Sequence, residues 1–318
     1  MEREEWLRER MKGVGGSEMA AILGLSPWQG PHDVWARKTG RMPEQEDTFR
    51  FKVGRFFEAP IAQLYADRER VSLSRIDGLM RHPTAPIVGT PDRLIVAGKN
   101  RGLEIKTASP SYRHHWGEEE YTDDVPNYYL VQVATYMMLA DLPEWDIAVM
   151  FGFQERDMRI YRVQRDAELE GMLIYRATTF WNRFVLGDEE PAIDGSEGCS
   201  DYIKRRYPKN IYDVRDADEA ETEIIASLVK ARGDTKYAAA VEGKLENQVK
   251  AMIGDAEGIW SAEGKFMWKK GKDRQVTDWE VAAAELQTYV SKEDWDKVIA
   301  LHTKNKEGSR TFRYSPAR

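Results

Sequence analysis

The chain has 318 residues, of which 42% are hydrophobic and 32% are charged, and its ten Trp and fourteen Tyr require a packed core. This composition excludes disorder over most of the chain, and a single cysteine, Cys199, excludes a disulfide framework or a cysteine-rich metal site. The formal net charge of −7 does not exclude nucleic acid as a partner, because binding requires positive potential only locally. No apolar run is long enough to span a bilayer, and the charged N-terminus lacks the apolar region of a secretory signal, so we expect a cytoplasmic protein.

The first elements of the chain are predicted to be helices. Gly16–Gly24 is expected to form a short helix with Ser17 as its N-cap, and Pro31–Thr39 a second helix that opens on proline. Between Phe49 and Tyr65 apolar residues recur at helical spacing. Pro60 interrupts this pattern, so we expect either a kink or a helix that starts only near Glu58.

The middle of the chain alternates between strands and helices. Short apolar runs bounded by glycine and proline predict buried strands at Pro86–Thr90, Leu94–Ala97, Leu103–Thr107, Trp145–Phe153 and Met158–Val163. Helices are predicted over Pro126–Leu139 and over Asp166–Leu186, which is followed by glycine. This order predicts an α/β core with a central sheet flanked by helices.

The composition changes near residue 200. Asp188–Asn210 is rich in glycine, proline, serine and charge, which is typical of a loop, and Ala217–Asp255 predicts a helical pair or a coiled-coil arm. We therefore expect a core domain over residues 1–200 and a mainly helical extension over 201–318. Tyr202–Lys209 and the tail Arg310–Arg318 mix basic and aromatic residues, which suits either DNA contact or a structural segment.

One short stretch combines carboxylates and a lysine inside apolar strands. Glu104 and Lys106 are two residues apart and therefore leave the same face of a strand. Asp92 and Glu104 are symmetric about Gly98, so a hairpin that turns there places the two carboxylates opposite each other. Opposed carboxylates require a cation, and such oxygen ligands suit Mg²⁺ or Mn²⁺. Lys106 would then position, or help to deprotonate, a water that attacks a phosphodiester. From these residues alone, a surface ion pair remains the alternative.

The order of motifs along the chain resembles a known family. The Pro-Asp and Glu-x-Lys pair resembles the PD-(D/E)XK nuclease core. The motifs RMKGVGGS, AAILGLSPW, VWARKTG, GRFFEAP, GTPD, LEIKT and VPNYYLVQVATYMM follow one another within residues 8–190. This series resembles the YqaJ-type viral recombinase family, which includes phage lambda-type exonuclease. The resemblance implies a PD-(D/E)XK fold with a central mixed sheet, to which the helical C-terminal extension is added.

The resemblance also implies a metal site. Asp92, Glu104 and the main-chain carbonyl of Ile105 match the metal ligands, and Glu58 in GRFFEAP matches a helix-borne acid that completes the site. Lys106 matches the lysine that orients the attacking water. For Glu58 the alternative is a carboxylate that only interacts with the dipole at a helix start.

Three further residues have implied roles at the substrate. Gln132 matches a helix glutamine that lines the site, and Arg10 and Ser17 match a pair that binds the terminal 5′-phosphate. A serine at a helix N-terminus offers a hydroxyl, an N–H and the positive end of the helix dipole to a phosphate. The alternatives are a buried core amide for Gln132, a solvated helix face for Arg10 and a simple cap for Ser17.

Taken together, these residues predict a Mg²⁺-dependent 5′-to-3′ exonuclease on linear double-stranded DNA, which releases mononucleotides and leaves 3′ single-stranded tails for phage-type recombination. The implied partners are duplex ends, a single-strand annealing protein and other copies of the chain, in a ring-shaped trimer. An endonuclease or single-strand nuclease without end dependence, and a non-catalytic DNA-binding protein, are the alternatives. His114 and His115 lack the further ligands of a zinc site, and GVGGS lacks the lysine of a P-loop.

Overall fold

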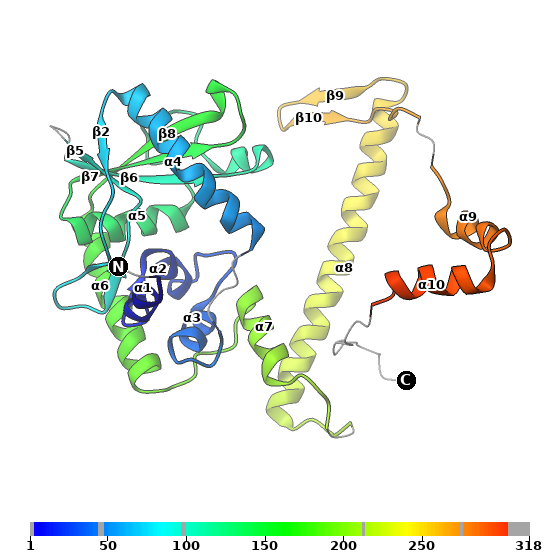
Figure 1. Ribbon diagram of the computed structural model, residues 1–318, viewed down its shortest axis with the longest axis horizontal. Coiled ribbons are helices and arrows are strands. Elements are labelled where there is room, and N and C mark those ends of the chain that lie inside the picture. The colour runs from blue at the N-terminus through cyan, green and yellow to red at the C-terminus, as the bar shows by residue number, and fades with distance from the viewer. Residues whose placement is uncertain (1–2, 44–47, 97–99, 212–213, 274–275, 305–318) are drawn as a thin grey trace. The chain divides into compact units, whose positions relative to one another are not determined.

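The computed structural model describes residues 3–43, 48–96, 100–211, 214–273 and 276–304. The chain divides into two compact units, Met1–Pro208 and Lys209–Arg318 (Figure 1). In the described part of the chain, no helix combines the length and the apolar character that a membrane span requires.

The first unit is built on a five-stranded sheet with the strand order β2-β5-β6-β7-β8. Its strands are β2 (Ser72–Ser74), β5 (Arg93–Val96), β6 (Arg101–Thr107), β7 (Glu144–Met150) and β8 (Met158–Gln164). β6 and β7 are parallel and the other neighbours are antiparallel, so the predicted central mixed sheet is confirmed. A smaller sheet joins β1 (Val14–Gly15), β4 (Ile87–Gly89) and β3 (Met80–Arg81).

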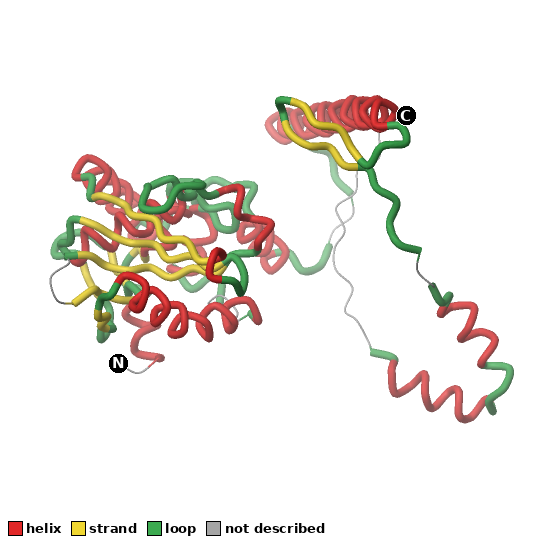
Figure 2. Tube along the Cα trace, turned by 90° about the horizontal axis from the view of Figure 1, so that it is seen from above, coloured by secondary structure: helices red, strands yellow, loops and turns green. Residues whose placement is uncertain are grey.

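Helices cover both faces of the central sheet (Figure 2). Trp145, Ile147 and Val149 of β7 pack into a core shared with α5 (Asn127–Ala140), whereas Ala148 packs with α4 (Phe49–Glu69). Alternate residues of a strand point to opposite faces, so α5 and α4 lie on opposite sides. The core on the α5 side also includes side chains of α2 (Gly16–Ile22), α3 (Pro31–Lys38) and α6 (Ala167–Phe180).

The start of α2 differs from the prediction. Gly15 is the N-cap, and its N–H donates to the carboxylate of Glu18 at 2.7 Å, so the assignment of Ser17 as N-cap is wrong. Ser17 lies inside the first turn and is exposed. α3 begins at Pro31, as predicted.

α4 runs through Pro60 without interruption, so the predicted helix start near Glu58 is wrong. Thr48 caps the helix by accepting a hydrogen bond from the N–H of Phe51. Pro60 is exposed and removes one main-chain hydrogen bond, while Ile61 and Tyr65 bury the opposite face against the sheet. Burial of that face stabilises the helix across the proline.

The end of the first unit also departs from expectation. Asp188–Asn210 was expected to be a loop, yet α7 (Glu197–Arg206) forms within it and packs on α3. Residue 200 falls inside α7, so the first unit extends beyond the predicted boundary. α6 continues to Leu186 as a π-helical segment, η3 (Trp181–Leu186), before Gly187.

The second unit is mainly helical, as predicted. Ala217–Asp255 contains one 35-residue helix, α8 (Glu219–Ile253), rather than a helical pair. It is followed by a hairpin of β9 (Gly258–Ser261) and β10 (Gly264–Met267), and by α9 (Trp279–Leu286) and α10 (Lys292–His302). The basic tail Arg310–Arg318 lies outside the described residues. Three further elements of the first unit are α1 (Arg3–Arg10), η1 (Pro110–His115) and η2 (Glu155–Asp157).

Candidate active site

The β5–β6 hairpin has the register that the sequence predicts. Arg93 pairs with Leu103 and Leu94 with Gly102, which places the next residues outward, Asp92 and Glu104, opposite each other. The turn about Gly98 lies outside the described residues.

Asp92 is tied directly to the strand that carries the Glu-x-Lys motif. Its Oδ2 accepts a hydrogen bond of 2.8 Å from the N–H of Ile105. The N–H and C=O of one strand residue point to the same edge, so the carbonyl of Ile105 faces the edge where the Asp92 carboxylate lies. The Asp92 carboxylate and the Ile105 carbonyl, two of the groups expected as metal ligands, therefore lie along the same edge of β6.

Glu104 is the centre of a buried polar cluster on the α5 side of the sheet. It is only 3% exposed, and its Oε1 accepts hydrogen bonds from Lys106 Nζ at 2.6 Å and from Gln132 Nε2 at 2.8 Å. Gln132 Oε1 in turn accepts from Lys106 Nζ at 3.2 Å. Glu104 Oε2 is buried and has no hydrogen-bond partner among the residues that the structure describes. One carboxylate oxygen is therefore left for a further ligand.

The pKa values of this cluster are shifted in a consistent direction. Burial and the neighbouring Glu104 carboxylate raise the pKa of Asp92 well above its ordinary value. Burial alone would lower the pKa of Lys106, but the carboxylates of Glu104 and Asp92 outweigh it and raise that pKa. In the metal-free protein Lys106 thus remains an ammonium, which donates hydrogen bonds and does not accept a proton.

The donor set fits a small divalent cation. Asp92 and Glu104 provide two carboxylates, Glu104 Oε2 is a buried oxygen without a hydrogen-bond partner, and the main chain of Ile105 offers a carbonyl. Mg²⁺ is commonly held by one or two carboxylates and retains several waters. Within the described ranges, no three His, Cys, Asp or Glu side chains lie together as a metal-binding group. Asp92 and Glu104 are the two predicted carboxylate ligands that the β5–β6 pairing brings together.

Glu58 is the predicted metal ligand whose carboxylate pairs with an arginine in the structure. Its Oε1 accepts a hydrogen bond of 2.6 Å from Arg93, a buried residue of β5. Arg93 pairs with Leu103, whose side chain packs on the α4 side, whereas Glu104 faces α5. Glu58 is near enough to raise the pKa of Asp92, yet its carboxylate is engaged by Arg93.

Two tyrosines of α5 belong to the site and were missed. Tyr129 places its ring centre 4.9 Å from Lys106 Nζ, and the Tyr136 hydroxyl accepts a hydrogen bond of 3.1 Å from Gln132 Nε2. Tyr129 and Tyr136 lie three residues before and four residues after Gln132, which puts all three side chains on one helix face. That spacing was the available signal.

Tyr136 also connects the Glu104 cluster to the N-terminus of α2. A Cβ on Gly16 would lie 2.7 Å from the ring of Tyr136, so only glycine allows this approach. Ser17 follows Gly16 directly and is exposed. The predicted phosphate-binding serine therefore lies next to a residue that contacts the site.

Arg10 approaches the same turn from α1. Its guanidinium stacks 5.2 Å from the ring centre of Trp6, and Trp6 donates a hydrogen bond of 3.0 Å to Thr90. Arg10 also helps to lower the pKa of the buried Glu18 carboxylate, which pairs with Lys38 at 2.8 Å. Arg10 and Ser17 thus lie at the same end of α2.

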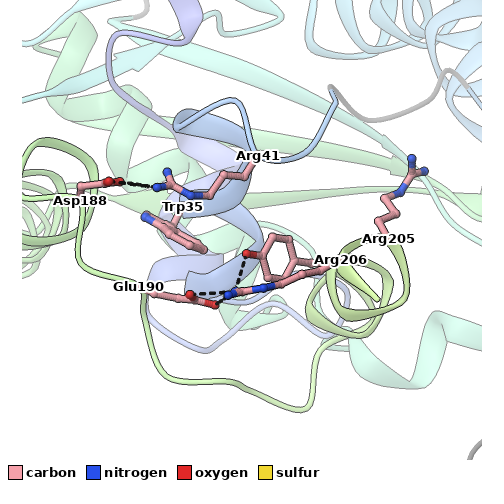
Figure 3. A pocket seen from close by; sticks show the side chains of 7 residues that line it. Trp35, Arg41, Asp188, Glu190, Arg205 and Arg206 are labelled. Atoms are coloured by element: carbon pink, nitrogen blue, oxygen red, sulfur yellow. Dashed lines mark hydrogen bonds and ion pairs between the residues drawn. The ribbon is translucent and has the colours of Figure 1, made fainter. Parts of the chain in front are cut away.

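The basic and aromatic stretch Tyr202–Lys209 has a structural role in its described contacts. Tyr202 is buried, with its ring centre 4.6 Å from that of His32, and Arg206 binds both Glu190 and the Tyr202 hydroxyl. Tyr202, Arg206 and Glu190 line a cavity of about 420 Å³ between α3 and α7, in which Arg41 pairs with Asp188 (Figure 3). The contacts of Tyr202 and Arg206 therefore stabilise the packing of α7 on α3.

Comparison with known proteins places the chain in a family. The YqaJ-like viral recombinase domain matches residues 5–143. The uncharacterized protein YqaJ of Bacillus subtilis (strain 168) is 33% identical over 275 residues, which cover 85% of this chain and 84% of the relative. The chain belongs to the YqaJ family. All predicted site residues of this YqaJ-family protein lie inside the matched domain.

Two solved structures are similar to parts of the YqaJ-family chain. The alkaline exonuclease LHK-Exo from Laribacter hongkongensis has a TM-score of 0.46 and 19% identity, over 64% of this chain and 97% of that chain. A phage-related exonuclease from Haemophilus somnus 129PT has a TM-score of 0.45 and 15% identity, over 56% of this chain and 96% of that chain.

Proposed function

We propose that the protein is a Mg²⁺-dependent exonuclease that degrades linear double-stranded DNA from a 5′-phosphorylated end. The observation that carries this proposal is the Glu104 cluster, in which a buried carboxylate oxygen without a partner lies beside Asp92 and a charged lysine. Membership of the viral recombinase family supports DNA as the substrate. Digestion of one strand from its 5′ end would leave a 3′ single-stranded tail, which suits a single-strand annealing protein.

In this proposal Asp92, Glu104 and the Ile105 carbonyl hold the cation. When bound there, a divalent cation would supply positive charge next to the phosphoryl oxygens and would lower the pKa of a bound water. Mn²⁺ suits the same oxygen ligands. Glu58 lies at the border of the site, where its Oε1 pairs with Arg93, and its second oxygen would complete the ligand set.

Lys106 and Gln132 orient the reacting groups. Lys106 Nζ lies 2.6 Å from Glu104 Oε1, where it can donate hydrogen bonds to the attacking water or to a phosphate oxygen. Gln132 fixes Lys106 and Glu104 relative to each other, because its amide donates a hydrogen bond to Glu104 and accepts one from Lys106. Tyr136 holds that amide in its orientation through the hydrogen bond from Nε2.

The 5′-phosphate would bind at the start of α2. Arg10 offers a guanidinium suited to bidentate phosphate contact, and Ser17 offers an exposed hydroxyl in the first turn. Support comes from Gly16, which packs against Tyr136 and so brings this turn next to the Glu104 cluster. The ring-shaped trimer implied by the resemblance stays a prediction, as does the annealing partner.

The test uses one duplex in three forms: linear with a 5′-phosphate, linear with a 5′-hydroxyl, and closed circular, each with and without Mg²⁺. We expect mononucleotide release from the phosphorylated end, much less from the hydroxyl end and none from the circle. Arg10→Ala should reduce the preference for phosphate by about tenfold, since a charge-assisted contact is lost. Cleavage of the circle would replace this proposal by an endonuclease, and binding without cleavage of any form would refute catalysis.

A further inference from the structure

The second unit contains a hairpin whose side chains are largely exposed. α8 ends at Gly254, which has a φ of +54°, and β9 and β10 follow in the second unit (Figure 1). The two strands pair antiparallel, with Trp260 opposite Lys265 and Ile259 opposite Phe266. Trp260 and Lys265 therefore share one face, while Ile259 and Phe266 share the other.

Both faces of this hairpin carry apolar side chains in contact with solvent. Trp260 is 73% exposed on one face, and Phe266 is 47% exposed on the other. Trp268, directly after β10, is also half exposed. A two-stranded hairpin has little stability of its own in water, and contiguous exposed apolar surface marks an interaction site. The hairpin thus has the properties of a binding surface.

Lysines lie beside the aromatic rings of the hairpin, which points to an anionic partner. Lys265 lies in β10, and Lys269, Lys270 and Lys272 follow that strand, where Asp273 pairs with Lys270. Lys265 lies with its Nζ 5.0 Å from the ring centre of Trp260, so a positive charge lies directly beside the exposed indole. Lys269 is anchored by an ion pair with Glu257 across the base of the hairpin. Flat rings flanked by ammonium groups suit a polymer of phosphates and aromatic bases.

We propose that the β9–β10 hairpin binds single-stranded nucleic acid. Bases stack on Trp260 and Phe266, and Lys265 with its neighbouring lysines binds the phosphates. A single strand suits this surface better than a duplex, because bases inside a duplex stack on one another and do not offer their faces. The binding does not depend on the nuclease proposal, although a 3′ tail made by that reaction is one strand of the required kind.

The test measures the binding of a fluorescently labelled oligothymidylate to the full-length protein by anisotropy, in chelator without divalent cations. Trp260→Ala should lower the affinity about tenfold, which is the usual range for loss of one stacked base. Trp279→Ala is the matched control, because Trp279 lies in the same unit and is 74% exposed, but is flanked by Asp278 and Glu280. This control should leave the affinity unchanged. Phe266→Ala should weaken binding through the other face.

A second variant covers the case in which Trp260→Ala disturbs the hairpin itself. Lys265→Glu leaves both aromatic rings in place, and we expect weaker binding with a shallower dependence on salt. Equal affinities of the Trp260→Ala and Trp279→Ala proteins, with Lys265→Glu also unchanged, would overturn the proposal. Equal weakening of single-strand and duplex binding by Trp260→Ala would overturn it as well, because stacking requires free bases. Both outcomes are read without any cleavage, so failure here is distinct from failure of the nuclease proposal.

Discussion

The two faces of the β6–β7 pair each carry a buried cluster of charges. The clusters differ in whether the central carboxylate has an oxygen without a hydrogen-bond partner. On the α5 side, Glu104 has one oxygen bound by Lys106 and Gln132 and a second oxygen without a partner. On the α4 side, both oxygens of the fully buried Asp146 accept hydrogen bonds. Glu104 can therefore take a further ligand at its second oxygen, whereas both oxygens of Asp146 are already bound.

The Asp146 cluster is built from the sheet and the end of α4. Asp146 Oδ1 accepts from Arg162 Nε at 2.8 Å, and Oδ2 accepts from the Tyr65 hydroxyl at 2.5 Å. Arg101 lies beside it, with Nη2 at 3.4 Å from Oδ2. A buried carboxylate matched by two guanidinium groups and a hydroxyl stabilises the arrangement of α4 on the sheet and is not accessible to a ligand. This cluster therefore has a structural role, whereas the proposed function gives Glu104 a chemical one.

The largest expected effect is on turnover at the Glu104 cluster. Lys106→Ala removes the ammonium that orients the attacking water, so the rate of DNA cleavage should fall by at least about 100-fold. DNA binding, measured separately, should be largely retained. Lys204→Ala, which removes an exposed lysine paired with Asp201 on α7, is the control and should cleave at the wild-type rate. Cleavage by Lys106→Ala at the control rate would remove Lys106 from the chemistry.

The second effect in size is on stability at the Asp146 cluster. Asp146→Ala leaves the buried Arg101 and the partly buried Arg162 without the carboxylate that they share, which should cost about 3–5 kcal/mol of unfolding free energy. Urea denaturation measures this loss. Cleavage per folded molecule should stay close to wild type, because the cluster faces away from Glu104. A stable Asp146→Ala protein with lost activity would reverse the assignment of the two clusters.

A smaller loss is expected at Tyr65. Tyr65→Phe removes the hydroxyl that donates to Asp146 Oδ2 while the ring keeps its place in the core. The unfolding free energy should fall by about 1 kcal/mol, with no effect on cleavage. If instead the variant unfolds as easily as Asp146→Ala, the hydroxyl matters more to the cluster than either arginine.

The smallest effect concerns Glu18, a third buried carboxylate, whose Oε2 is bound by the N–H of Gly15 and by Lys38. Burial would raise its pKa, but Lys38 and Arg10 outweigh burial and lower it below the ordinary value of 4.5. A lowered pKa in the folded state contributes stability above pH 4.5, and that stability is lost as the pH falls through the folded value. Wild type should therefore lose thermal stability on acidification more steeply than Glu18→Gln. If the melting temperatures of the two proteins fall in parallel between about pH 6 and about pH 3, this expectation is contradicted.

The sequence predicted the features of the site that depend on local geometry. The pairing of Asp92 with Glu104 follows from symmetry about the turn, and the shared face of Glu104 and Lys106 follows from strand alternation. The position of Glu58 was not predictable in this way. Its ion pair with Arg93 depends on α4 packing on the face opposite α5, which is a property of the tertiary fold.

Other elements were missed because long-range packing overrides local signals. Pro60 predicted a kink in α4 or a helix start near Glu58. The helix nevertheless runs through the proline, because its buried face packs on the sheet. The contact between Gly16 and Tyr136 joins residues far apart in sequence, so no local pattern reveals it. α7 was hidden in a stretch of loop-like composition, and burial of Tyr202 against α3 stabilises it.

Binding of Mn²⁺, followed by electron paramagnetic resonance, tests the difference between the two clusters most directly. Wild type, Glu104→Gln and Asp146→Asn are compared at a temperature where all three are folded. We predict that Asp146→Asn binds Mn²⁺ with wild-type affinity, and that Glu104→Gln binds at least about tenfold more weakly, because one charged oxygen ligand is lost. Wild-type affinity in Glu104→Gln would contradict the assignment of the metal site to the Glu104 cluster.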